Sequence, residues 1–311
     1  MFKLKPPTTY DEQLRLLESR GMQIPDREKA LIALQNENYY RLSGYTFHMK
    51  KAPTTEQFVD GSSFETVLYL YNYDKALRNL LFKYIDTIEI RIRTKIAYHF
   101  SHACTSYGHY NPINFVSYDA CDDFSQSLTK AIIKNKDAAF VKQHINNYSN
   151  TKVDPPEYYM PLWAAVEILS LSTLSKFYKN IGNPAIQVEI ANSIEVNSAR
   201  LGNWLHSIAC LRNLCAHHGR IYNQALHPAI QYSELFYFSI RPYKLPTDHI
   251  FGYIPALIAL LPDQSQRHQL LQELKELNNR YFPLIDKTLL GYPDDWTQYF
   301  SKWESLSSFL L

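Results

Sequence analysis

The amino-acid sequence predicts an all-α protein. Apolar residues recur at intervals of three and four over long stretches, hydrophobic residues make up 46%, and glycine accounts for only 9 of 311 residues. Glycine at about 3%, against a usual ~7%, argues against turn-rich β-sandwiches, P-loops and dinucleotide-binding folds, because these need glycine for unusual backbone angles. The length fits one large domain or two small ones.

The N-terminal region, residues 1–58, is expected to be helical. Leucine spacing predicts a helix over Tyr10–Gly21, with Gly21 as its C-terminal cap. Pro25-Asp26 begins a second predicted helix that runs to about Gln35, because either residue suits a first turn. Around Phe58 the pattern also allows short strands.

The central region, residues 59–228, contains the longest helical pattern. A continuous apolar stripe over Phe64–His102 predicts a long bundle helix, with a break near Tyr73-Asp74. The other predicted helices of this region are Phe124–Tyr148 (one helix or two), Met160–Asn180 (a pair or one kinked helix), Pro184–Ser193, and Asn197–His218, capped by Gly219.

The C-terminal region, residues 229–311, is expected to be a helical extension. Five prolines from Pro228 to Pro262 indicate a stretch rich in loops, and an amphipathic helix is predicted over Gln264–Tyr281. The longest apolar run, Phe251–Leu261, is about half of a membrane span, so no membrane partner is expected.

Charge and cysteine content exclude several classes of protein. The 32 lysines and arginines and 30 aspartates and glutamates give a net charge of +2, which excludes a polybasic nucleic-acid binder but not a local basic surface. Four scattered cysteines, none in a CxxC pair, predict neither a disulfide framework nor a zinc site. Met1–Tyr10 lacks the apolar core of a signal peptide, so we expect a cytoplasmic protein without metal or cofactor.

The predicted helix Asn197–His218 has two chemically different faces. At 100° per residue, His206, Asn213 and His217 lie within about 40° of one another, and Arg212 lies at the margin of the opposite, apolar face. The apolar face consists of Leu201, Trp204, Ile208, Leu211 and Cys215.

Arg212, Asn213 and His217 together carry the groups needed to cleave RNA without metal. An imidazole exchanges protons near neutral pH, a guanidinium holds phosphate, and an amide can orient either group. One helix supplies half of a site, which a second copy of the chain could complete. The alternative interpretation is structural, since histidine and arginine also complement the dipole at the end of a helix.

The same residues resemble a known family. Arg212-Asn213-Leu-Cys-Ala-His217 resembles the R-x4–6-H motif of HEPN domains, and LRNLCAHHGRIYN resembles the signature of Abi-like (AbiD/AbiF) abortive-infection proteins. The resemblance extends from about Lys5 to Asn223. Three earlier segments resemble that family in the same order: RGMQIPDREKALIAL with NENYYRLSGY, LYNYDKALRNLLFKYIDTIEIRIRTKIAYHFS, and MPLWAAVEILSLSTLSKFY.

The resemblance implies a HEPN-like helical bundle, a role in antiphage defence, and RNA as partner or substrate. By motif match, His217 would be the acid–base group, Arg212 the phosphate-stabilising group and Asn213 the orienting amide. HEPN ribonucleases generally need no metal and often build their site across a homodimer. Some members of the family are associated with a small noncoding RNA, and some HEPN domains bind RNA without cutting it, so both possibilities stay open.

A second R-x5-H pattern runs from Arg93 to His99, and it makes Arg93 a candidate for binding RNA. Glu89 lies four residues before Arg93, so the alternative is an ordinary ion pair on one helix. Arg91 and Lys95 extend this basic run but point to other faces of the helix, which favours a solvated surface. Arg78-Asn79 resembles the start of the motif and has no histidine within reach.

Four further residues are candidates for binding RNA. Tyr40 and Arg41 could stack on unpaired bases, although tyrosines at a seam between domains are the alternative. His218 and Arg220 adjoin the proposed catalytic residues in sequence. Glu167 could orient the imidazole or hold Arg212, or it could face solvent.

Overall fold

The computed structural model describes residues 6–150, 157–241 and 243–305, and helices are the regular elements of this part of the chain. The predicted all-α fold class is confirmed. Instead of strands around Phe58 there is an isolated bridge between Phe58 and Lys50. The outermost residues of the predicted terminal regions, 1–5 and 306–311, lie outside the described residues.

Ten of the α-helices in the described residues correspond to predicted helices, and the other four were not predicted. Their bounds are α1 (Tyr10–Ser19), α2 (Arg27–Asn36), α3 (Tyr39–Ser43), α4 (Phe64–Cys104), α5 (Tyr118–Lys134), α6 (Ala139–Tyr148), α7 (Leu162–Ile168), α8 (Leu171–Lys179), α9 (Pro184–Asn192), α10 (Ser198–Ala216), α11 (Glu234–Ser239), α12 (Ile250–Leu260), α13 (Gln264–Tyr281) and α14 (Trp296–Ser305). The 3-10 turns used below are η1 (Phe47–Met49), η2 (Gly108–Tyr110) and η3 (Pro112–Asn114).

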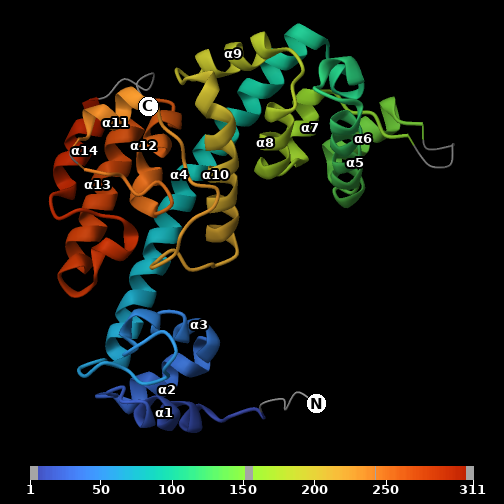
Figure 1. Cartoon of the computed structure of the whole chain (residues 1–311). Helices are drawn as coiled ribbons and strands as arrows, with labels where there is room; N and C mark the ends of the chain where they lie inside the picture. Colours follow the sequence, from blue (N-terminus) through green and yellow to red (C-terminus); the bar gives the residue numbers. More distant parts are fainter. Residues whose placement is uncertain (1–5, 151–156, 242, 306–311) are drawn as a thin grey trace.

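The long helix α4 is the axis of the molecule. Its 41 residues span about 60 Å, and Figure 1 shows α1–α3 at one end, α10 alongside, α11–α14 on one side and α5–α8 beyond the other end. The Ser63 side chain accepts the Thr66 amide and begins the helix. The break expected near Tyr73-Asp74 does not occur, because both side chains are buried and find partners inside the fold.

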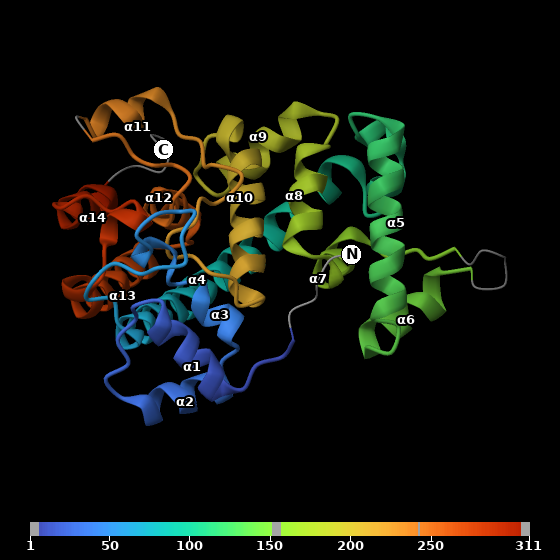
Figure 2. The same ribbon diagram turned by 60° about the horizontal axis from the view of Figure 1, so that its bottom comes forward.

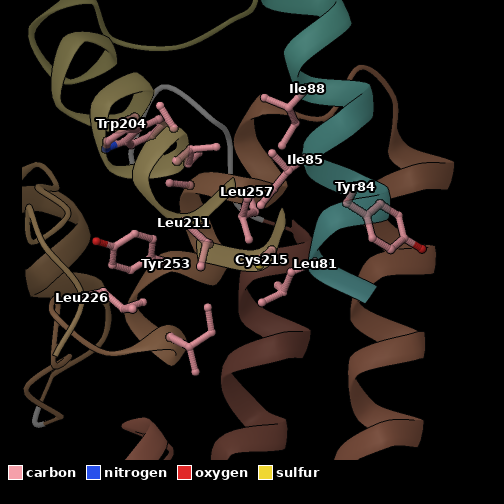
Figure 3. Packing of buried hydrophobic residues seen from close by; sticks show 14 of the residues in the cluster. Leu81, Tyr84, Ile85, Ile88, Trp204, Leu211, Cys215, Leu226, Tyr253 and Leu257 are labelled. Atoms are coloured by element: carbon pink, nitrogen blue, oxygen red, sulfur yellow. The ribbon is translucent and has the colours of Figure 1, made fainter. Parts of the chain in front are cut away.

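The core forms where α4, α10 and α12 meet. Leu81, Ile85 and Ile88 on α4 lie opposite Leu211 on α10 and Leu257 on α12, as Figure 3 shows, and each is at most 2% exposed. Burying such side chains contributes about 1.5–3 kcal/mol each. This contact holds α10, which carries the candidate catalytic residues, rigidly against the axis of the molecule.

Helix α12 corrects the expectation of a loop-rich stretch between Pro228 and Pro262. All residues of α12 are buried, and Pro255 lies inside the helix. A helix that is apolar on every side shows no amphipathic period, so its sequence did not predict it. Arg91 on α4 donates to the carbonyls of Leu260 (2.8 Å) and Leu261 (3.0 Å), which completes the end of α12. Within the described part of the chain, no helix has both the length and the apolarity needed to cross a membrane.

His109 is a buried histidine between η2 and α5. Its ring lies 4.2 Å from the Tyr110 ring and 5.9 Å from the Phe124 ring, measured between centroids. Neither ring nitrogen has a hydrogen-bond partner among the described residues, and burial lowers the pKa of His109 from 6.5 to about 4. The native state therefore holds His109 neutral.

This depressed pKa predicts a loss of stability in acid. The unfolded chain binds a proton at His109 below pH 6.5 whereas the native state does so only near pH 4, so stability is full above pH 6.5 and falls between these values. A shift of this size corresponds to about 3 kcal/mol. Chemical denaturation at pH 7 and pH 4.5 should show a smaller pH dependence for His109→Phe than for the wild type. The exposed histidine variant His206→Gln should match the wild type, and equal slopes for all three proteins would contradict the assignment.

Candidate functional site

Helix α10 ends two residues earlier than the sequence predicted. The Asn197 side chain accepts the Ala199 amide and begins the helix, and His217 is its C-terminal cap. His218, rather than Gly219, takes the left-handed backbone conformation, with φ of 57°. Gly219 is required for space, because a Cβ atom there would lie 2.9 Å from the Cγ atom of Leu214.

Arg212 lies in a cleft of about 570 Å³ that α4, α10 and the α7–α8 connection form. Its Nε atom donates to Glu89 Oε2 at 3.2 Å, and its guanidinium lies 5.6 Å from the centre of the Phe82 ring. Glu89 is only 6% exposed and also pairs with Arg93 on the same helix. We call this the Arg212 cleft; Glu167 is exposed and lines it too.

Arg93 and His99 face different neighbours. Arg93 bonds to Glu89 and to the carbonyl of Val166 at the end of α7, so the structural alternative of an ion pair is confirmed. His99 approaches Glu189 on α9, with 4.0 Å between Nδ1 and Oε2. The R-x5-H pattern therefore does not bring its arginine and histidine to one place.

Asn213 and His217 occupy the remaining positions of the R-x4-H motif. Asn213 donates from Nδ2 to the Ser172 hydroxyl at 3.1 Å, which joins α10 to α8. His217 is exposed at the end of α10, and His206, eleven residues earlier on the same face, is exposed too. Burial raises the pKa of the nearby Cys215 thiol to about 12, so that thiol is a neutral core group and not a nucleophile.

The loop after α10 is held by a buried ion pair that sequence reasoning missed. Asp74 and Arg78 on α4 are 0% and 3% exposed and pair with each other. Asp74 accepts the backbone amides of Ile221 at 3.1 Å and Tyr222 at 2.8 Å, and the hydroxyl of Tyr45 at 2.6 Å. Arg78 donates from Nη1 to the Gly219 carbonyl at 3.2 Å.

The surroundings fix the protonation of this network. Burial, with the adjacent carboxylate of Asp74, raises the pKa of Tyr45 far above its usual range, so its hydroxyl stays a donor. Burial also raises the pKa of Asp74, while Arg78 and the hydrogen bonds oppose that rise. A sequence signal existed, because Asp74 and Arg78 are charged residues inside the apolar stripe of α4.

Tyr40, Arg41, His218 and Arg220 come together in a second hollow, a groove of about 560 Å³ between α3, η1 and the loop after α10. Figure 2 shows α3 beside the end of α10, and Arg41 donates to the His218 carbonyl at 2.6 Å. We call this the Tyr40 groove. Four of the residues predicted to bind RNA thus share one surface, whereas the fifth, Arg93, lies in the Arg212 cleft.

Comparison with known proteins identifies the family. The family model described as Abi-like protein matches residues 32–223, which is more than half of the chain. This chain is an Abi-like protein. It is therefore related to proteins named for abortive infection. No curated protein and no solved structure matches the chain.

The matched range of this Abi-like protein contains the buried network. It contains Tyr45, both members of the Asp74–Arg78 pair and the whole of α10, and it ends at Asn223. The Arg220 side chain donates to the carbonyls of Tyr222 and Asn223, so the matched range ends at a residue that holds Arg220. Among the described residues of the protein, no group of three or more metal-ligating side chains occurs.

The buried network generates a prediction about stability. Asp74→Ala should lower the free energy of unfolding by about 3–5 kcal/mol, because Arg78 would keep a buried charge without its partner. The matched control is Asp86→Ala, an exposed carboxylate on the same helix, which should change stability by less than about 0.5 kcal/mol. Chemical denaturation measures both, and equal losses would show that the Asp74 network does not hold the loop.

Proposed function

We propose that this Abi-like protein is an abortive-infection protein that binds RNA and cleaves it as a metal-independent endoribonuclease of the HEPN type. One observation carries the proposal. His217 is exposed at the end of α10, while Arg212 and Asn213, one turn earlier, are anchored by Glu89 and Ser172. An exposed proton-transfer group on the same helix as fixed phosphate-binding and amide groups supplies the parts needed for attack by a ribose hydroxyl.

The proposed reaction needs no group from outside the protein and the RNA. His217 removes the proton of a 2′-hydroxyl, whose oxygen attacks the adjacent phosphorus. The bond from phosphorus to the 5′-oxygen breaks, and that oxygen takes the proton back from the imidazolium of His217. The products are a 2′,3′-cyclic phosphate and a 5′-hydroxyl end. Arg212 stabilises the added negative charge on phosphorus, and Asn213 orients the reacting groups.

Glu89 is compatible with this role of Arg212. A guanidinium has five N–H donors, and among the described residues Glu89 takes the Nε donor alone. The planar fork that remains can hold two phosphate oxygens. Glu89 then acts as a positioning group that fixes the arginine before RNA binds.

We propose that a second copy of the chain completes the site. Arg212 and His217 are five residues apart, which turns them roughly 140° from each other around a helix and favours contributions from two copies. Beside the Arg212 cleft, apolar side chains are exposed on α4 and α7, including Ile90 (57%), Tyr98 (58%) and Trp163 (53%). Such a surface suits contact with an identical copy.

If the site forms in a homodimer of this kind, a charge placed on the exposed face of α4 should separate the two copies. Light scattering should give twice the mass of one chain for the wild type and the mass of a single chain for Ile90→Glu, which should also lose cleavage. Ile32→Glu, an equally exposed position on α2, should stay dimeric and active. A wild-type protein that cleaves RNA as a monomer would remove the second copy from the mechanism.

A second candidate function is RNA binding without cleavage, in a complex with a small noncoding RNA. The observation in its favour is that Glu89 and Glu167 balance the charges of Arg212 and Arg93 in the same cleft. Arginines neutralised in this way bind phosphate less strongly than free ones. Under this alternative, Arg212 and His217 would contact RNA but leave its backbone intact.

Cleavage of labelled RNA in EDTA distinguishes the two functions. The wild type should produce fragments with cyclic phosphate ends, and His217→Ala should be about 10²- to 10⁴-fold slower, the usual contribution of acid–base catalysis. His206→Ala, an exposed histidine on the same helix, is the control and should cleave like the wild type. Tight binding without cleavage would favour the second function, and a requirement for Mg²⁺ would contradict the mechanism.

A further inference from the structure

The Tyr40 groove differs in charge from the Arg212 cleft. Arg41, His218 and Arg220 line the Tyr40 groove, and no described carboxylate does so. The Arg212 cleft holds two arginines with two glutamates and is formally neutral. A groove with two permanent cations and no acid has a positive potential and favours an anionic ligand.

The groove also presents aromatic rings to solvent. Tyr40, on α3, is 85% exposed, and Phe47, the first residue of η1, is 57% exposed. The Arg220 guanidinium lies 5.6 Å from the centre of the Phe47 ring and donates to the Tyr222 carbonyl at 3.0 Å. The loop contacts therefore fix this charge beside a ring before any ligand arrives.

We infer that the Tyr40 groove binds one unpaired nucleotide of single-stranded RNA, with its base against the Tyr40 ring and its phosphate beside Arg41 and Arg220. Aromatic rings and arginines are the usual platform for unpaired bases, whereas paired bases keep their faces covered by stacking within the duplex. The inference rests on the proposed action on RNA and specifies its substrate as single-stranded.

The position of the groove connects it to the proposed chemistry. His218 lines the groove and directly follows His217 in the chain, so their Cα atoms are about 3.8 Å apart. A nucleotide in the groove therefore places a neighbouring phosphodiester close to the end of α10. The buried Asp74–Arg78 pair sets this spacing, because it holds Gly219, Ile221 and Tyr222 behind the groove.

Binding to a fluorescent 12-nucleotide single-stranded RNA tests the inference. The measurements use the full chain with His217→Ala in EDTA, so that the probe stays intact, and fluorescence anisotropy gives Kd. Adding Tyr40→Ala should weaken binding roughly 5- to 100-fold, the range for loss of one stacked base. Adding Tyr118→Ala, a tyrosine of similar exposure on α5, should leave Kd unchanged.

A second variant reports on the phosphate contact. Arg41→Gln should reduce the slope of log Kd against log salt concentration by about 0.7, the value for one contact with a single strand. A blunt-ended RNA duplex of 12 base pairs, which has no unpaired nucleotide, should bind at least tenfold more weakly than the single strand. Circular dichroism of each variant checks that the helical fold is kept.

The outcomes separate this inference from the proposed function. If the wild type cleaves RNA and Tyr40→Ala binds like its parent, the groove is not the binding site and the nuclease proposal stands. Equal affinity for the blunt-ended duplex and the single strand overturns the substrate class. If no RNA binds or is cleaved, the proposed function fails, and the groove inference fails with it.

Discussion

The carboxylate of Asp74 is the contact on which the arrangement of the Tyr40 groove depends. It joins the turn after α3, the N-terminal third of α4 and the loop after α10 through Tyr45, Arg78 and two backbone amides. A buried charge of this kind is costly unless every lone pair finds a donor. Here one donor lies on the same helix and the others come from two distant segments, so the charge of Asp74 is fully compensated only when all three segments are in place.

The two clefts use arginine in different ways. Glu89 fixes Arg212 and Arg93 and cancels much of their charge, whereas Arg41 and Arg220 are held by backbone carbonyls and keep theirs. A carbonyl orients a guanidinium without neutralising it. Arg212 is thus fixed in position and largely neutralised, whereas the Tyr40 groove keeps a positive charge that attracts anions. The groove has this local charge although the net charge of the protein is only +2.

The sequence predicted most helices because amphipathic segments carry a clear period, and it predicted the Glu89–Arg93 pair from its spacing. It failed at α12, where burial on all sides removes the period, and at Asp74, where a charge interrupts an apolar stripe. Spacing along α10 identified the candidate residues. It could not show that Arg212 and Arg220 belong to different clefts, because that depends on α3 and α7.

Helix α4 carries both anchoring carboxylates on one uninterrupted rod. Asp74, behind the Tyr40 groove, and Glu89, in the Arg212 cleft, are separated by four turns, or about 22 Å along the axis. Because one continuous helix carries both carboxylates, the anchor behind the Tyr40 groove and the anchor in the Arg212 cleft keep a fixed separation along α4.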